Sequence, residues 1–259
     1  MTRTQDWNPN SYARFGDLRL RPALDLLGQV GELPEGNVLD LCCGTGAAGP
    51  ALAAKFSGHL IEGLDASPAM LEAAARTGCY TNLIENDAAT WRAPTRLALV
   101  FSNAALHWLP DHATLLPELA GQLAPGGVLA VQMPRQFGAP SHRFLRDFAA
   151  EMFADRFGAV HWASPVDTPI EYHRILAPLG EVNVWETDYV QKLRPSKPAH
   201  PVRRFTEATA MRPYLDQLNN TETEEFIRRY EQALFAAYPT EPDGSVLFPF
   251  RRLFFTLTV

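Results

Sequence analysis

Short apolar runs alternate with segments of helical periodicity along the first half of the chain. Runs rich in Val, Leu and Ile predict β-strands at residues 37–41, 59–64, 80–85, 97–102 and 128–133. Helical periodicity between them predicts helices at residues 47–56, 69–76 and 113–123. Strands that alternate with helices in this way predict a parallel sheet with right-handed crossovers.

The pattern changes after residue 133, where helices outnumber strands. We expect an α/β fold with a mostly parallel seven-stranded sheet, helices on both faces and the last strand antiparallel. The helices predicted in this second part cover residues 141–157, 169–177, 202–218 and 221–237, and the strands cover residues 182–190 and 246–259.

The loop after the first strand suggests a nucleotide-type cofactor in a Rossmann-like fold. Asp40 precedes Gly44 and Gly46, and glycines at such a turn let backbone N–H groups approach a ligand closely. The next strand ends before Asp65, an acid placed to accept hydrogen bonds from ribose hydroxyls.

Two glycine patterns fit this loop, and they point to different cofactors. Gly44, Gly46 and Gly49 match the G-x-G-x-x-G spacing of dinucleotide sites. The stretch from Asp40 to Gly46 also fits the acid-x-Gly-x-Gly-x-Gly pattern of S-adenosylmethionine sites, except that Cys42 stands where glycine is usual. We expect this cysteine to have ordinary backbone angles and to narrow the space beside the cofactor.

Composition and charge exclude several classes of protein. A net charge of −6 argues against broad binding to nucleic acid or to anionic membranes, both of which need a positive field. No apolar run reaches eighteen residues, and the first six residues carry no apolar signal core, so we expect a cytoplasmic location. The three cysteines have no metal-ligand spacing. Most basic residues are arginines, so we expect guanidinium groups in any anion-binding pocket.

The chain resembles the Rossmann-like S-adenosylmethionine-dependent methyltransferases, because acids or amides follow four successive strands in the expected order. The resemblance implies S-adenosylmethionine as cofactor, with Asp87 on the adenine amino group, Ala88 on a ring nitrogen and Met70 on the adenine face. The cofactor-binding residues that we expect are Tyr12, Asp40, Cys43, Gly44, Gly46, Asp65, Ala66, Met70, Asp87, Ala88 and Asn103.

Over nearly its full length the chain is similar to the trans-aconitate 2-methyltransferase family. The blocks that carry this similarity include residues 7–9, 65–70, 103–112, 131–134, 211–213 and 243–254. The resemblance implies methyl transfer to one carboxylate of trans-aconitate, a small tricarboxylate, without a catalytic acid, base or metal. A carboxylate is already a nucleophile at neutral pH, so the site has to position the reactants and bind an anion. The candidate substrate residues are Arg21, His107, Trp108, Tyr172, Arg212 and Arg252.

These interpretations combine into one expected domain over residues 1–259. Residues 1–30 would form a helical lid that includes Tyr12, residues 37–133 the cofactor-binding core, residues 134–245 a helical cap around the sixth strand, and residues 246–259 the last strand. We expect a monomer.

Three alternatives stay open. The first is a methyltransferase for another small or carrier-bound acid, for which the arginine pairs at 203–204 and 228–229 would form a basic rim. The second is an NAD-dependent oxidoreductase, and the third is a non-catalytic cofactor-binding module.

Overall fold

The computed structural model describes residues 16–158, 163–207 and 209–259, which belong to two compact units. The first unit consists of the chain up to Pro134 together with Pro165–Glu186 and Leu253–Val259. The second unit consists of Arg135–Ser164 and Thr187–Arg252. In the described part of the chain, no helix is long and apolar enough to cross a membrane.

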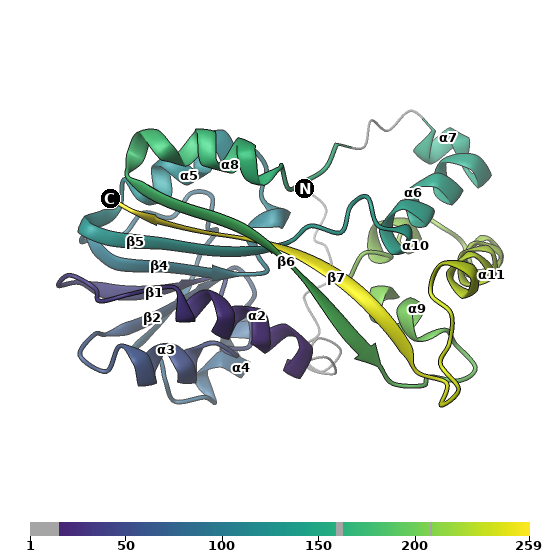
Figure 1. Cartoon of the computed structure of the whole chain (residues 1–259), viewed down its shortest axis with the longest axis horizontal. Helices are drawn as coiled ribbons and strands as arrows, with labels where there is room; N and C mark the ends of the chain where they lie inside the picture. Colours follow the sequence, from purple (N-terminus) through teal and green to yellow (C-terminus); the bar gives the residue numbers. More distant parts are fainter. Residues whose placement is uncertain (1–15, 159–162, 208) are drawn as a thin grey trace. The chain divides into compact units, whose positions relative to one another are not determined.

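A seven-stranded sheet runs through the fold in the order β3-β2-β1-β4-β5-β7-β6, which confirms the predicted fold class (Figure 1). Neighbouring strands from β3 to β5 are parallel; Asp40 on β1, for example, lies opposite Gly63 on β2 and Phe101 on β4. The strands are β1 (Asn37–Leu41), β2 (Ile61–Asp65), β3 (Asn82–Glu85), β4 (Leu97–Asn103), β5 (Leu123–Pro134), β6 (Glu181–Leu193) and β7 (Val246–Thr258).

The last strand, β7, is antiparallel to β5, as predicted. Within the first unit, the Gly126 N–H donates to Val259 O at 2.7 Å and the Val259 N–H donates to Gly127 O at 3.1 Å. Within the second unit, the Arg135 N–H donates to Arg251 O at 3.0 Å. Residue numbers therefore rise along β5 while they fall along β7, which is the antiparallel arrangement.

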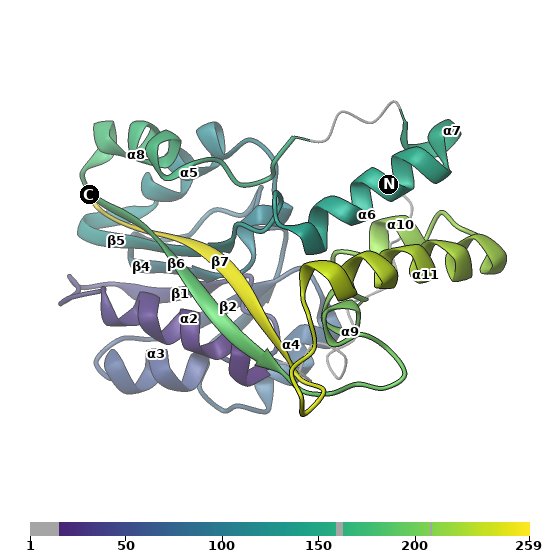
Figure 2. The same ribbon diagram turned by 45° about the vertical axis from the view of Figure 1, so that its right-hand side comes forward.

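Helices cover both faces of the parallel part of the sheet (Figures 1 and 2). On one side lie α2 (Gly16–Gly28), α3 (Gly49–Lys55) and α4 (Pro68–Ala75), and on the other lie α5 (His112–Ala120) and α8 (Pro169–Leu176). The Ser67 hydroxyl caps α4 by accepting from the Met70 N–H at 3.3 Å, as the Ser-Pro signal predicts. The helix predicted at 169–177 is confirmed as α8.

The second unit contains α6, α7, α9, α10 and α11 and the remaining halves of β6 and β7. The predicted helix at 141–157 breaks at Phe153, whose φ of −135° and ψ of 56° are not helical, and the predicted helix at 202–218 is also divided. The helices are α6 (Pro140–Met152), α7 (Ala154–Phe157), α9 (Pro201–Glu207), α10 (Arg212–Leu215) and α11 (Asn220–Ala237). That this segment caps the carboxyl edge of the sheet stays a prediction.

Substitution of Gly180, just before β6, tests how closely the last strands of the first unit pack. A Cβ atom at this position would overlap the carbonyl oxygen of Thr258 and lie 3.0 Å from its carbonyl carbon. Gly180→Ala should therefore lower the free energy of unfolding by about 1–3 kcal/mol, because backbone atoms have to move apart. Gly58→Ala is the control, since a Cβ there meets nothing within 4 Å. Urea denaturation that gave equal midpoints for the two variants would contradict this packing.

Candidate active site

Four strands end at one edge of the sheet and bring the predicted cofactor residues together there. Because β1, β2, β3 and β4 are parallel, the residues that follow their carboxyl ends lie along the same edge. The strand order reverses between β1 and β4, and open α/β sheets bind ligands in the crevice at such a reversal. The residues at this edge are Gly44, Asp65, Asp87 and Asn103.

The loop between β1 and α3 takes its shape from three residues with positive φ. Gly44 and Gly46 have φ of 55° and 75°, and Cys42 has φ of 57°. The expectation of ordinary backbone angles at Cys42 is therefore wrong. The left-handed region costs a residue with a Cβ roughly 1–2 kcal/mol, so Cys42 holds the conformation that glycine would adopt without strain.

Asp65 joins this loop to the start of α4. Its Oδ2 accepts from the Gly44 N–H at 2.9 Å, and its Oδ1 accepts from the Ser67 N–H at 2.9 Å. An ionised carboxylate has about four acceptor positions, so two backbone bonds leave capacity for hydroxyl donors. The side chain is half-buried, and its neighbour Ala66 is exposed. That these remaining positions bind ribose hydroxyls stays a prediction.

The Asp40 side chain is hydrogen-bonded to a tyrosine of the same chain, a contact that the sequence did not predict. The carboxyl group is 3% exposed and accepts from the Tyr80 hydroxyl at 2.6 Å. Added Cβ atoms at Gly46, Gly49 and Gly63 would come within 2.9, 2.8 and 3.1 Å of the Tyr80 ring. The glycines at these positions leave room for the tyrosine, and this packing explains two of the three glycines of the apparent dinucleotide motif.

The start of α3 also argues against a dinucleotide. Pro50 occupies the first turn and has no N–H to offer a pyrophosphate.

Burial controls the ionisation of the groups around this loop. It raises the pKa of Asp40 to about 7, with the charge of Asp65 adding to the effect and the Tyr80 hydrogen bond opposing it. Burial also raises the pKa of Cys42 to about 12 and that of Cys43 further. Both thiols are therefore protonated at neutral pH, and neither is a nucleophile.

The residues that follow β3 and open α4 include two buried apolar side chains and one exposed acid. Met70 and Ala88 are both buried, whereas Asp87 is exposed. One Asp87 oxygen, Oδ1, accepts from the Ala89 N–H at 2.9 Å. The contact of these residues with an adenine stays a prediction.

The end of β4 contains a buried acceptor that lacks a donor. Among the described residues, no donor lies within hydrogen-bonding distance of the buried Asn103 Oδ1. A buried polar atom without a partner costs roughly 1–3 kcal/mol, so this oxygen fits a ligand that supplies an N–H or O–H.

Beyond Asn103, the short helix η1 (Leu106–Trp108) carries two aromatic side chains. The rings of His107 and Trp108 lie 4.7 Å apart, and Trp108 is 51% exposed. Their assignment to the substrate stays a prediction.

The structure does not support Tyr172 as a substrate residue. Its side chain is fully buried, its ring stacks on Phe255 at 5.6 Å, and its hydroxyl lies 2.6 Å from His112 Nδ1. The same hydroxyl accepts from the Asp167 N–H at 3.3 Å. Tyr172 therefore has a packing role in the core between α8 and the sheet.

The three predicted arginines are not brought together in one unit. Arg21 lies on α2. Its side chain is 76% exposed, and its Nε lies 3.9 Å from Asp25 Oδ2. Arg212 begins α10 in the second unit, where Arg252 is buried with its guanidinium 4.7 Å from the Phe250 ring centroid. Tyr12 lies outside the described residues.

These features together fit S-adenosylmethionine better than a dinucleotide or a metal. The edge offers acceptors for hydroxyls and amines at Asp65, Asp87 and Asn103, and open space beside Gly44, where an added Cβ would meet nothing within 4 Å. No group of three His, Cys, Asp or Glu side chains in the described ranges could hold a metal ion.

The raised pKa of Asp40 predicts a specific pH dependence of stability. Its contribution to the free energy of unfolding is fully present below its unfolded pKa of 3.8 and is lost as pH rises through about 7. Asp40→Asn keeps an acceptor for Tyr80 but does not titrate, so it should gain stability relative to the wild type between pH 4 and 7. Urea denaturation across this range measures the difference, with Asp25→Asn on the exposed face of α2 as the control. Parallel profiles for the wild type and Asp40→Asn would contradict the assignment.

Comparison with known proteins gives the family. A family model described as "Methyltransferase domain" matches residues 38–127. Trans-aconitate 2-methyltransferases of Methylobacterium radiotolerans and Escherichia coli are 42% and 39% identical to the chain, and each alignment covers 96% of both sequences. The YcgJ protein of Bacillus subtilis has a similar fold, with a TM-score of 0.56 at 14% identity over 92% of this chain and 98% of that one.

The fold of a second solved structure agrees with this result. Phosphoethanolamine N-methyltransferase 2 of Haemonchus contortus, in complex with S-adenosylhomocysteine, has a TM-score of 0.56 at 16% identity and covers 99% of this chain and 58% of that one. Identity of about 40% along the full length exceeds what a shared fold alone produces. The chain therefore belongs to the trans-aconitate 2-methyltransferase family.

Proposed function

We propose that this enzyme methylates one carboxylate of trans-aconitate with S-adenosylmethionine, giving the monomethyl ester and S-adenosylhomocysteine. The observation that carries the proposal is the similarity to trans-aconitate 2-methyltransferases over 96% of the chain. The site supports it with an acceptor-rich edge and without a reactive thiol, since both loop cysteines are held protonated.

The first unit supplies the residues that would hold the cofactor. Asp65 would accept from the ribose hydroxyls, Asp87 from the adenine amino group, and Asn103 Oδ1 from a donor on the methionyl part. Met70 and Ala88 would contact the adenine ring, and the loop from Cys43 to Gly46 would pass close to the sulfonium side. When bound, S-adenosylmethionine supplies a methyl group on a sulfonium that accepts the electrons of the broken C–S bond.

The protein's part in the reaction is to bind and orient. A carboxylate with a pKa near 4 is ionised at neutral pH, so no side chain has to remove a proton. A substrate oxygen held in line with the methyl carbon and the sulfur gains the rate advantage of proximity, which can reach about 7–11 kcal/mol in favourable systems. This requirement explains why charged recognition groups matter more here than a general base.

The carrier-bound alternative needs a basic rim, and the two arginine pairs do not form one. Arg203 Nε lies 2.8 Å from Glu231 Oε1, and Arg204 Nη1 lies 3.0 Å from Glu207 Oε2. On α11, Arg228 lies 4.0 Å from Glu225 and Arg229 pairs with Glu151. Each arginine has a carboxylate partner in the second unit, which favours a small free acid as substrate.

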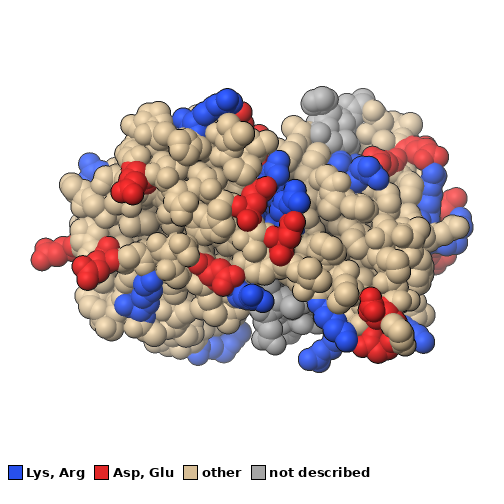
Figure 3. Space-filling model, viewed as in Figure 1, with Lys and Arg blue, Asp and Glu red and all other residues tan. Residues whose placement is uncertain are grey.

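We further propose that the enzyme is a monomer in the cytoplasm and does not bind nucleic acid. Basic and acidic side chains are interspersed over the face seen in Figure 3, without a continuous basic surface on that face. Light scattering after size exclusion tests the monomer, and cell fractionation tests the location.

Gly44→Ala tests the cofactor loop against a matched control. Gly44 and Gly78 both have positive φ, of 55° and 67°, and a Cβ at either position meets nothing within 4 Å. Alanine should cost each variant a similar roughly 1–2 kcal/mol of stability. Only Gly44→Ala should weaken S-adenosylmethionine, by tenfold or more, because its methyl group enters the space assigned to the cofactor. Calorimetric Kd values that are equal for the two variants would contradict the assignment.

The activity itself is tested with labelled S-adenosylmethionine and a panel of acids. We expect turnover on trans-aconitate to exceed that on cis-aconitate, isocitrate and a malonyl thioester. Preferred turnover of the thioester would favour the carrier-bound alternative. Cofactor binding without turnover of any acid would reject trans-aconitate as the substrate.

A further inference from the structure

Asp40, the acid that precedes the cofactor loop of the first unit, accepts a short hydrogen bond from a tyrosine. Tyr80 lies between α4 and β3, and its hydroxyl is 2.6 Å from Asp40 Oδ2. This distance falls in the range of charge-assisted O–H···O⁻ bonds, about 2.5–2.7 Å. The bond therefore favours the ionised form of a carboxyl group that is only 3% exposed.

The position of Tyr80 is fixed from two sides. The next residue, Thr81, donates from both its N–H and its hydroxyl to Ile61 O, each at 2.8 Å, so this segment is tied to the start of β2. On the other side, Cβ atoms at Gly46 and Gly49 would come within 2.9 and 2.8 Å of the tyrosine ring. The hydroxyl is consequently held at the carboxyl group by the packing of its own ring.

The charges that act on this loop come from acids. Burial is the largest cause of the raised pKa of Cys42, and the charges of Asp65, Asp40 and Asp87 raise it further. The charge of Asp65 also raises the pKa of Asp40. Ionised carboxylates this close to one another repel, and a positively charged ligand relieves that repulsion.

Tyr80 influences how much of this negative charge is present at neutral pH. Burial raises the pKa of Asp40 to about 7, and the Tyr80 hydrogen bond keeps it from rising further. Burial and the charge of Asp40 raise the pKa of Tyr80 itself, with Cys43 and Cys79 acting in the same direction. The tyrosine therefore stays a donor, and without it Asp40 would be mostly protonated at neutral pH.

The cofactor and its product differ in charge at one atom. The sulfur of S-adenosylmethionine carries a methyl group and a positive charge, and the sulfur of S-adenosylhomocysteine carries neither. The adenosyl and amino-acid groups are common to both. A carboxylate in a site of low dielectric constant attracts the sulfonium and has no such attraction for the neutral sulfur.

We propose that Tyr80 is a positioning residue whose hydroxyl keeps Asp40 charged, so that the site binds S-adenosylmethionine in preference to S-adenosylhomocysteine. The inference rests on the cofactor of the proposed function and goes beyond it by assigning the exchange of product for new cofactor. Once the methyl group has been transferred, the attraction to Asp40 is lost and the product is held less tightly.

The test compares the affinities of both ligands across a range of pH. Calorimetric titrations give the ratio of the S-adenosylhomocysteine Kd to the S-adenosylmethionine Kd from about pH 6 to about pH 9. At neutral pH, Tyr80→Phe should lower this ratio at least about threefold. Raising the pH should restore it, because Asp40 ionises again, with a midpoint about one pH unit or more above that of the wild type.

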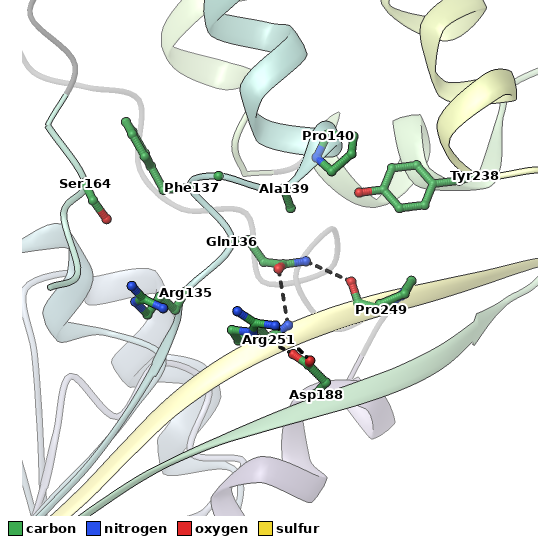
Figure 4. A pocket seen from close by; sticks show the side chains of 11 residues that line it. Arg135, Gln136, Phe137, Ala139, Pro140, Ser164, Asp188, Tyr238, Pro249 and Arg251 are labelled. Atoms are coloured by element: carbon green, nitrogen blue, oxygen red, sulfur yellow. Dashed lines mark hydrogen bonds and ion pairs between the residues drawn. The ribbon is translucent and has the colours of Figure 1, made fainter. Parts of the chain in front are cut away.

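Two further variants serve as controls. Tyr238→Phe also removes the hydroxyl of a buried tyrosine, one that accepts from the Ser141 N–H at 3.2 Å and lines the second-unit pocket shown in Figure 4. It should keep the wild-type ratio and midpoint. Asp40→Asn should show a low ratio at every pH, because asparagine does not titrate. Titration of groups on the ligands affects all variants alike and cancels in the comparison.

The outcomes separate a role in charge from a role in packing. If Tyr80→Phe weakens both ligands equally and high pH does not restore the ratio, Tyr80 only packs and the inference is wrong. A pH-dependent ratio that persists in Asp40→Asn would assign the effect to another acid, such as Asp65, and also overturn it. If Tyr80→Phe fails to fold, Asp40→Asn decides, since a wild-type ratio in that variant would reject the inference.

Failure of the inference can be told apart from failure of the proposed function. If the wild type binds neither ligand, both are overturned. If the ratio responds to Tyr80 and Asp40 as expected but trans-aconitate is not methylated, the inference stands and only the proposed substrate is rejected.

Discussion

The hydrogen bond between Asp40 and Tyr80 is the interaction on which the candidate cofactor loop depends. It joins the carboxyl end of β1 to the segment that leads into β3, two parts of the chain 40 residues apart. The Tyr80 ring fills the space left by Gly46, Gly49 and Gly63, so it fixes the turn after β1 and its distance from β2. Because Asp40 is buried, breaking this bond would leave its carboxyl group without the Tyr80 donor, which costs more than the bond itself contributes.

Asp65 forms a hydrogen bond to the loop that this packing has shaped. Its bonds to the Gly44 and Ser67 N–H groups hold the ends of two separate turns next to each other. The acid consequently has a structural role before any ligand binds. A ligand that bonds to the same carboxylate meets a group already oriented by the backbone, which reduces the entropy lost on binding.

The chemistry proposed for the enzyme explains the kind of groups that its two units present. Methyl transfer to a carboxylate needs neither a base nor a metal, so the demands fall on holding a cationic cofactor and an anionic acid. The first unit offers carboxylates and a buried amide oxygen. In the second unit, Arg251 makes a bidentate ion pair with Asp188. Arg203 and Arg229, by contrast, pair with the neighbouring carboxylates of Glu231 and Glu151.

The sequence by itself determined the order of strands and helices, the class of sheet and the family. Periodicity and turn residues act locally, so the Ser67 cap and the apolar run at 97–102 could be read without a structure. The resemblance added the residues at the strand ends, since parallel strands place their carboxyl ends along one edge.

Only the tertiary structure decided which side chains meet. It gave Asp40 a tyrosine partner, buried Tyr172 in the core, and placed Arg135 beside Arg251 across 116 residues of chain. It also showed positive φ at Cys42, where the side chain suggests an ordinary conformation. These results depend on strand pairing and burial between distant segments, and local propensity carries no information about such contacts.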